Sequence, residues 1–202
     1  MRPRQVSDHD ILAAARRCIL QHGPSVSTTV IAQEVGLSQA ALFKRFGTKD
    51  DLVIRALMPV DAPEWILHVE KGLDERPALE QLRDIAGRMA LFFDEMIPCL
   101  SMLRARFDPM DVMKRHPDPP PIRGRAALVA WFEEARAKGL VRPIEPQAAA
   151  QAFIGALHGR AFMRHVASGT AGAALESADE DLYVDHLLDV LWHGLAPERT
   201  LS

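Results

Sequence analysis

The chain has 202 residues, a formal net charge of −3 at pH 7 and 48% hydrophobic residues. That length suits one compact unit or two small ones, and no apolar run approaches the length of a membrane span. The first ten residues, MRPRQVSDHD, lack the apolar stretch of a secretion signal, so we expect a cytoplasmic protein without membrane association. The two cysteines, Cys18 and Cys99, are too few for a disulfide framework and are expected to be buried free thiols.

A first helix is predicted to begin after Ser7, which is a good N-cap. Asp10 stands at the third helical position, where its carboxylate completes a capping box. Ile11, Ala15 and Ile19 recur four residues apart and form an inward stripe.

Two further helices, both short and joined by a tight turn, are predicted in TTVIAQEVGLSQAALFKRF, which begins at residue 28. Thr28 or Thr29 is expected to cap the first of them. Ile31 and Val35 form its apolar face, and Gly36 ends it because glycine enters a left-handed conformation without steric cost. Residues from about 27 to 46 thus have the pattern of a helix-turn-helix.

The second helix of this pair has the features of a DNA-recognition helix. Ser38 is its N-cap, and Leu42 and Phe46 stand four apart and point inward. Gln39 is placed to pair with adenine, and Lys44 to reach a guanine edge or a phosphate. The outward face also includes Ala40, Ala41 and Phe43. The two small alanines let the helix axis approach base edges, and Ala41 suits a thymine methyl group.

The next helix is predicted to begin at Thr48, which forms a capping-box-like start with Asp51. Lys49 lies beside this helix N-terminus, where backbone N–H groups already favour a phosphate. Residues 1–58 carry eight Lys and Arg against five Asp and Glu, whereas residues 59–202 carry 16 against 22. A basic head on an acidic body favours orientation on a polyanion. On spacing and charge alone, a generic helical hairpin with a solvated basic surface fits as well, and so small a charge difference also fits chance variation.

One combined pattern covers about a quarter of the chain: Ile11-Leu12-Ala13-Ala14-Ala15, Gly23, Thr28-Thr29, Ile31-Ala32, Val35-Gly36-Leu37-Ser38, Leu42-Phe43, Phe46, Lys49 and Leu52. In this pattern the segment from about Ser7 to Leu57 resembles the DNA-binding domain of the TetR family of bacterial transcriptional regulators. The resemblance implies sequence-specific binding of double-stranded DNA. The residues expected to contact DNA are Thr28, Thr29, Ser38, Gln39, Ala40, Ala41, Phe43, Lys44, Arg45 and Lys49.

The chain departs from the family pattern at three of these positions. Phe43 stands where the family usually has Tyr, whose hydroxyl commonly meets a phosphate, and Phe43 lacks that donor. Ala40 stands where Gly is frequent. Arg45 replaces His or Tyr and restores some phosphate affinity.

The remainder of the chain is predicted to be helical, because no segment shows the sustained strict alternation of a strand. Helices are expected over residues 78–97, 100–115, 123–138, from about 147 to 166, and 179–193. Prolines mark a joint after residue 58 and separate the first two of these helices, and residues 116–121 are expected to form a loop. The sequence therefore predicts an all-α protein. It has a three-helix helix-turn-helix DNA-binding domain over residues 1–57 and a larger helical effector-binding and dimerisation domain over residues 58–202.

The larger domain is rich in methionine and aromatic residues, which suit an adaptable apolar pocket. The family resemblance implies that some of them line an effector cavity. The candidates are Met89, Phe92, Phe93, Met96, Met102, Phe107, Met110, Trp131 and Phe132. An ordinary hydrophobic core is the alternative for each residue.

Small residues in the helix ending near residue 166 permit close helix approach, and the last helix is rich in leucine. The resemblance implies that these two helices pair with those of a second subunit in a homodimer. The candidates are Ala152, Gly155, Ala156, Gly159, Leu187, Leu188, Leu191 and Trp192. Packing within one chain is the alternative.

No catalytic residue, cofactor or metal site is predicted. Asp189 and His193 have chelating spacing, but surface or interface histidines are favoured there. The sequence contains no Gly-rich phosphate loop, no nucleophile-elbow pattern and no CxxC motif.

The leading interpretation is a homodimeric transcriptional regulator that binds a near-palindromic operator, with repression favoured over activation. A small apolar or amphipathic effector would release it. One alternative is a ligand-independent DNA-binding adaptor or architectural protein, which would not respond to ligands. A second is a small helical enzyme with an incidental motif, which would keep its turnover without residues 1–50.

Overall fold

The computed structural model describes residues 6–58, 62–108, 111–112, 119–167 and 180–195. Every regular element in these ranges is a helix, and none of the described residues forms a strand. The chain divides into two compact units. The first comprises Met1–Asp61 and Pro98–Pro117, and the second comprises Ala62–Ile97 and Asp118–Ser202. The predicted all-α class is confirmed.

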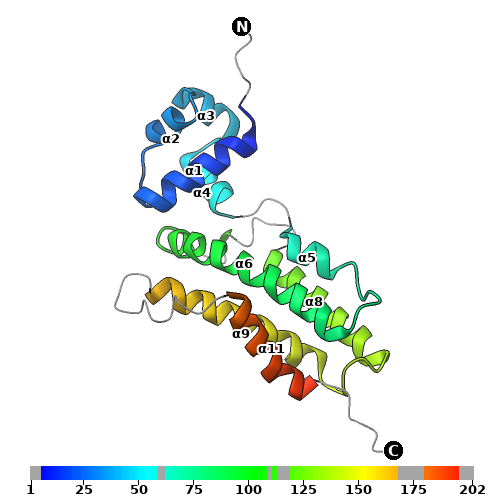
Figure 1. Ribbon diagram of the computed structural model, residues 1–202. Coiled ribbons are helices and arrows are strands. Elements are labelled where there is room, and N and C mark those ends of the chain that lie inside the picture. Colours follow the sequence, from blue (N-terminus) through cyan, green and yellow to red (C-terminus); the bar gives the residue numbers. More distant parts are fainter. Residues whose placement is uncertain (1–5, 59–61, 109–110, 113–118, 168–179, 196–202) are drawn as a thin grey trace, which may run out of the picture. The chain divides into compact units, whose positions relative to one another are not determined.

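The first unit is built on four short helices, drawn from blue to cyan in Figure 1. They are α1 (Asp8–His22), α2 (Thr28–Glu34), α3 (Gln39–Phe46) and α4 (Lys49–Leu57). Helix α1 packs against α2 and α4, and α3 packs against both α2 and α4. Ile11, Ile19, Ile31, Leu42 and Leu52 are almost wholly buried between them. This small core fixes α3 with one face turned outward.

Local capping fixes the ends of these helices. Reciprocal capping boxes form between Ser7 and Asp10 in α1 and between Thr48 and Asp51 in α4, as the sequence predicts. The cap of α2 is Ser27, whose hydroxyl accepts a hydrogen bond from the Thr29 N–H, so the assignment to Thr28 or Thr29 was wrong. Gly36 follows α2 with φ of +67°, which is the left-handed turn expected of it.

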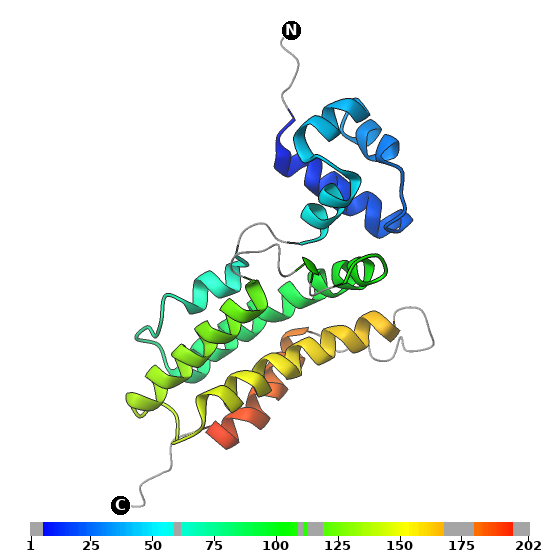
Figure 2. The same cartoon turned by 180° about the vertical axis from the view of Figure 1, so that it is seen from behind.

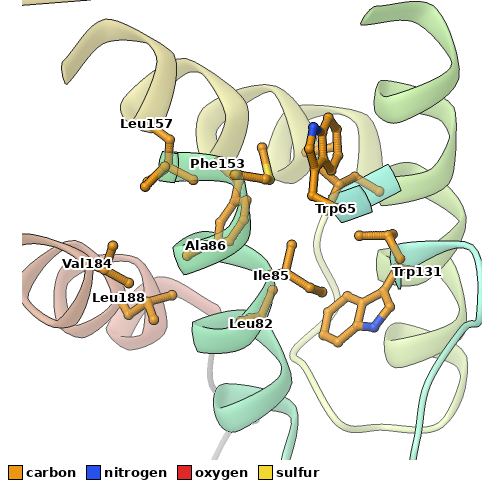
Figure 3. Packing of buried hydrophobic residues seen from close by; sticks show 14 of the residues in the cluster. Trp65, Leu82, Ile85, Ala86, Trp131, Phe153, Leu157, Val184 and Leu188 are labelled. Atoms are coloured by element: carbon orange, nitrogen blue, oxygen red, sulfur yellow. The ribbon is translucent and has the colours of Figure 1, made fainter. Parts of the chain in front are cut away.

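The second unit contains α5 (Glu64–Val69), most of α6 (Ala78–Arg104), α8 (Pro120–Ala137), α9 (Pro146–Ala167) and α11 (Glu180–Leu195). Helix α8 packs closely on both α5 and α9, and Figure 2 shows this arrangement from behind. Figure 3 shows the core that these helices enclose, with Trp65 from α5, Ile85 from α6 and Trp131 from α8. Phe153, Val184 and Leu188 extend the same cluster into α9 and α11.

Three elements differ from the sequence-based expectations. Helix α5 was not predicted, because its six residues are too short to show a helical period. Helix α6 continues through Pro98 instead of stopping there. Helix α8 begins at Pro120, inside the run expected to be a loop.

Both proline errors have a physical reason. Pro98 cannot donate to the carbonyl of Asp94, but Ile97, Cys99 and Leu103 beside it are buried, and their packing offsets the lost bond. Proline is tolerated in the first turn of a helix, where its missing N–H has no helical partner in any case. The loop assignment was therefore wrong for Pro120 and Pro121, and residues 116–118 lie outside the described ranges.

None of the described helices is long and apolar enough to span a membrane. Both cysteines are buried free thiols, as predicted. Burial raises the pKa of the Cys18 thiol, and the negative charge of Glu34 adds to this effect.

Candidate DNA-binding and effector sites

The exposed face of α3 brings together most of the predicted DNA-contacting residues. Leu42 and Phe46 anchor the helix in the core and leave the opposite side free. The exposed side chains on α3 are Gln39, Ala40, Phe43, Lys44 and Arg45, and Ala41 is half-buried beside them. This face of the helix-turn-helix therefore carries both hydrogen-bond donors and small apolar groups.

Gln39 is held in place by the helix before it. Its Nε2 donates to Thr28 Oγ1 at 2.5 Å, and Thr28 is 4% exposed. Thr28 thus positions Gln39, and its own side chain is too buried to meet DNA directly. Thr29 and Ser38 are exposed, and the hydroxyl of Ser38 caps α3 by accepting from the Ala41 N–H.

The three cations differ in their availability to a phosphate. Arg45 donates to the carbonyl of Val6 at 2.6 Å, and Lys49 donates to the carbonyl of Ser25 at 3.0 Å. Lys44 makes no hydrogen bond or ion pair with the part of the chain that the structure describes. It is therefore the α3 cation best placed for a new contact. Phe43, 39% exposed, presents an aromatic ring without the hydroxyl that the family's usual tyrosine would carry.

The candidate effector residues do not gather in one place. Met89, Phe93, Met96, Trp131 and Phe132 are buried in the second unit, and Phe92 is half-buried beside them. Met102 and Phe107 are half-buried and belong to the first unit, and Met110 lies outside the described residues. The second unit thus holds the larger group.

Sequence reasoning missed Trp65, which forms part of that group. Trp65 is 5% exposed and packs 6.2 Å from Phe92, measured between ring centroids. Phe92 in turn lies 5.5 Å from Phe93. The indole of Trp65 rests against Gly124 of α8, where an added Cβ would lie 2.3 Å from Cη2. Nothing in the local sequence pairs these two residues, because they meet only when α5 packs on α8.

A cavity of about 130 Å³ lies at the turn between α5 and α6. Val69, Ile85 and Trp131 form an apolar part of its lining, and His68, Lys71 and Arg76 supply polar groups. Gln81 is buried and donates to the carbonyls of Asp74 and Arg76, which fixes the turn. His68 Nε2 lies 3.1 Å from Asp84. The polar groups on this side of α5 are therefore largely engaged with one another.

The candidate dimer residues fall into two sets. On α9, Ala152 and Gly155 are exposed, and Ala156 and Gly159 are half-buried. On α11, Leu187, Leu191 and Trp192 are partly buried against the chain's own core, and Leu188 is 1% exposed. Leu188 is thus unavailable to a partner. The sequence does not tell an inward leucine face from an outward one.

The exposed apolar surface lies elsewhere on the same two helices. Phe162, Met163 and Val166 of α9 are 45–54% exposed, and Leu182 and Val190 of α11 are 50% and 72% exposed. The three α9 residues continue the exposed side of that helix that begins at Ala152 and Gly155. No group of three possible metal ligands occurs among the described residues.

A helix-turn-helix with an open recognition face, joined to an all-helical second unit, defines a DNA-binding transcriptional regulator of the all-α class. Residues 11–56 match the family model "Bacterial regulatory proteins, tetR family", and residues 80–192 match "AefR-like transcriptional repressor, C-terminal domain". The chain belongs to the TetR family of bacterial transcriptional regulators, with a C-terminal domain of the AefR-like type. The resemblance seen in the sequence is confirmed.

Several solved structures share the fold. FadR from Bacillus subtilis, in complex with stearoyl-CoA, has a TM-score of 0.70 at 15% identity over 92% of this chain and 97% of that one. FadR from Bacillus halodurans, a fatty acid degradation regulator, has a TM-score of 0.69 at 16% identity over 96% and 100%. SmeT, the repressor of the Stenotrophomonas maltophilia multidrug efflux pump SmeDEF, has a TM-score of 0.65 at 18% identity over 98% and 94%.

Proposed function

We propose that this regulator is a homodimeric repressor that binds a near-palindromic operator and is released by a small apolar or amphipathic effector. The observation that carries the proposal is the exposed face of α3, where Gln39 is pre-positioned and Lys44 is available for a new contact. The DNA is the main partner, and no catalytic role is assigned to the chain.

On DNA, α3 enters the major groove with its N-terminal residues at the base edges. Gln39 reads adenine once its amide exchanges Thr28 for the base, and Lys44 meets a guanine edge or a phosphate. Phe43 contributes apolar contact with thymine methyl groups or the sugar backbone. Arg45 and Lys49, which bond to backbone carbonyls of the head, stabilise the fold of the head near the phosphates.

The proposed dimer forms through α9 and α11. Helix α11 is fixed to its own chain by the ion pair between Arg83 and Asp185, at 2.7 Å, and by the Arg160 guanidinium 4.2 Å over the ring of Tyr183. The side of α11 that carries Leu182 and Val190 remains exposed. Together with Phe162, Met163 and Val166 of α9, these residues form an apolar surface that a second copy would cover. Two heads are then available for two half-sites about 34–36 Å apart.

Effector control is proposed to act through α6. This helix begins in the second unit and ends in the first, with the division between the units at Pro98. Just beyond its end, Arg106 donates from Nε and from a terminal nitrogen to Asp50, at 3.1 and 2.6 Å. Asp50 lies in the first turn of α4, so movement of this segment is transmitted to the head. The effector must favour the DNA-incompetent arrangement, and coupling of about 1–3 kcal/mol changes DNA affinity about 5–150-fold.

The effector class is inferred from the interior of the second unit. Its buried surface around α6 consists of Met89, Phe93 and Met96 with aromatic neighbours, which accommodate an apolar guest by changing rotamer. A relative of the same fold was solved with stearoyl-CoA, an amphipathic ligand with a long apolar chain, which supports an apolar or amphipathic effector here.

The proposal is tested by binding of the purified full chain to the DNA upstream of its own gene, measured by fluorescence anisotropy. We expect a specific complex at nanomolar concentrations and its loss when an apolar effector from a compound panel is added. Equal affinity for the upstream DNA, for sequences selected from a random pool and for unrelated DNA would overturn DNA recognition. Specific DNA binding that no panel member alters would overturn effector control.

A further inference from the structure

The indole nitrogen of Trp65 is a buried hydrogen-bond donor without an acceptor. It is the only side-chain nitrogen or oxygen of this kind among the described residues. Trp65 is 5% exposed and belongs to the core cluster of the second unit, where Figure 3 shows it reaching inward from α5. A buried donor that lacks an acceptor costs about 1–3 kcal/mol, so such a group calls for an explanation.

The neighbours of Trp65 supply no acceptor. Its ring edge rests on Gly124, and Ile66 lies beside the same contact. The closest ring is that of Phe92, tilted by 54° at 6.2 Å between centroids, and an aromatic face is at most a weak acceptor. Gly124 is what admits the indole, because any Cβ at that position would overlap it. The donor is therefore held at a fixed place by packing and not by a hydrogen bond.

The charged groups around Trp65 indicate the chemistry of its missing partner. On the same helix, Glu64 pairs with Arg88, and His68 lies 3.1 Å from Asp84. Arg88 also donates to Asp84 at 2.8 Å. On α8, Arg123 forms two hydrogen bonds of 2.6 Å with Glu70. Arg88 and Arg123 thus each have a carboxylate partner already, and an anionic ligand beside them would enter without a free counter-charge.

We propose that Trp65 Nε1 is the polar anchor of the effector site, and that it selects an apolar, uncharged effector bearing an acceptor oxygen such as a ketone, ester or amide carbonyl. This inference rests on the proposed effector control and names the chemical class of the effector. The ring beside the indole is that of Phe92, which is only half-buried. Because folding has already removed water from the donor, the bond to a ligand oxygen is not offset by dehydration of the protein group.

The test compares two probes of one shape. 2-Octanone carries the acceptor, and 2-methyl-1-octene replaces its oxygen with a methylene group. The full chain is labelled with ¹⁵N in the indole rings, and Trp131→Phe and Trp192→Phe variants assign the resonances of the other two tryptophans. We expect the ketone to shift the Trp65 N–H proton downfield and to bind about tenfold more tightly than the alkene. The alkene should leave that proton unbonded.

The substitution Trp65→Phe removes the N–H and keeps an aromatic ring. We expect it to abolish the preference for the ketone, while Trp131→Phe, at another buried indole of the same core, preserves it. If Trp65→Phe lowers the folded fraction, the two-probe comparison on the unsubstituted chain still decides the question.

Three results would overturn the inference: a ketone series from 2-butanone to 2-decanone that never shifts the Trp65 resonance, a ketone preference that survives Trp65→Phe, or a free protein in which water already bonds the indole. Its failure is distinct from failure of the proposed function. A compound that releases DNA without moving Trp65 leaves effector control standing, and a ketone that bonds Trp65 without changing DNA affinity leaves only the anchor standing.

Discussion

Gly124 of α8 allows close packing in the second unit because it has no side chain where the Trp65 ring lies. Helix propensity alone favours alanine at a helical glycine by about 0.5–1 kcal/mol. The packing opposes this preference, because a Cβ on Gly124 would lie 2.3 and 2.7 Å from two carbons of the Trp65 indole. The ring is fixed among buried neighbours and cannot move aside without disturbing α5.

We therefore predict that Gly124→Ala lowers the free energy of unfolding by about 1–3 kcal/mol, as overpacking does elsewhere. The matched control is Gly87→Ala on α6, where an added Cβ meets nothing within 4 Å and φ is not positive. That control should stabilise the protein by about 0.5–1 kcal/mol. Urea denaturation of both variants measures the difference. If Gly124→Ala and Gly87→Ala had the same free energy of unfolding, the close packing of Trp65 on Gly124 would be refuted.

Lys44 provides a residue-scale test of DNA recognition. If it reads a base, Lys44→Ala should weaken specific binding by about 1–3 kcal/mol and relax sequence preference. If it meets only a phosphate, the loss should be similar on all sequences, with a salt dependence shallower by about one unit of slope. Anisotropy titrations at several salt concentrations separate the two. Lys138→Ala removes a lysine that pairs with Glu134 on α8 and serves as control. Normal affinity in Lys44→Ala would contradict both versions.

Residue signals that act locally could be predicted, whereas contacts made at a distance could not. Ser7, Thr48 and Gly36 take the roles expected of them, because caps and left-handed turns depend on the nearest few residues. The hydrogen bond from Gln39 to Thr28 spans eleven residues and arises only when α2 and α3 pack. The same holds for Trp65 and Gly124, which adjoin only in the folded chain.

At the scale of elements, the main differences between prediction and structure come from prolines and from the spacing of apolar residues. Pro98 and Pro120 were both expected outside helices, yet one sits inside α6 and the other begins α8. Burial around Pro98 outweighs its lost bond, which no local rule captures. In α11, Leu188 is buried in its own chain's core, whereas Leu187 and Leu191 are only partly buried against it, because a helix with two apolar faces leaves its orientation open.

Helix α5 depends on packing and ion pairs more than on its own propensity, since isolated helices of this length are marginal. At the C-terminal end of α5, the cap residue Glu70 accepts two hydrogen bonds from Arg123 of α8, each 2.6 Å long. These bonds hold the pKa of the Glu70 carboxyl below its ordinary value of 4.5. The ion pair between Arg123 and Glu70 therefore links α8 to the end of α5, and its strength depends on pH.

We predict that Glu70→Gln lowers the melting temperature at neutral pH, corresponding to a loss of about 1 kcal/mol. A depressed carboxyl pKa contributes stability that is complete above the unfolded value and is lost as pH falls through the folded one. The difference between the parent protein and the variant should therefore decrease as the pH falls below 4.5 and disappear once it passes the lower pKa of the folded state. Thermal melts from pH 3 to 7 provide the measurement. Glu133→Gln is the control, because Glu133 is an exposed carboxylate of α8 that forms no ion pair with the part of the chain that the structure describes. A difference that persisted in acid would exclude this electrostatic origin.

For the whole molecule, the division into units follows the three-dimensional contacts and not the chain order. The segment Pro98–Pro117 returns to the head after the second unit has begun, which no linear reading of domain boundaries anticipates. Under the effector control proposed above, this return would let a ligand signal reach the DNA-binding head along a helix. Helix α6 supplies that path by spanning both units.

The exposed apolar surface of α9 and α11 yields the prediction that involves the whole assembly. Val190 is 72% exposed and lies on the surface that the proposed partner covers. In an isologous interface one substitution places two charges in the contact, so Val190→Glu should raise the dimer dissociation constant at least tenfold. Sedimentation velocity over a dilution series measures this constant. Operator affinity should fall in parallel, because a monomer grips one half-site.

Ile122→Glu is the matched control, since Ile122 is 58% exposed but lies in the first turn of α8, outside the proposed interface. It should leave both the dimer and operator binding unchanged, and both variants should keep the parent's helical content because neither side chain is buried. Equal dissociation by the two substitutions would point to a general effect of the added charge and not to a specific interface. A Val190→Glu protein that remained dimeric at nanomolar concentration would place the contact between subunits on another surface. The spacing of the two heads would then have to be derived from that other surface.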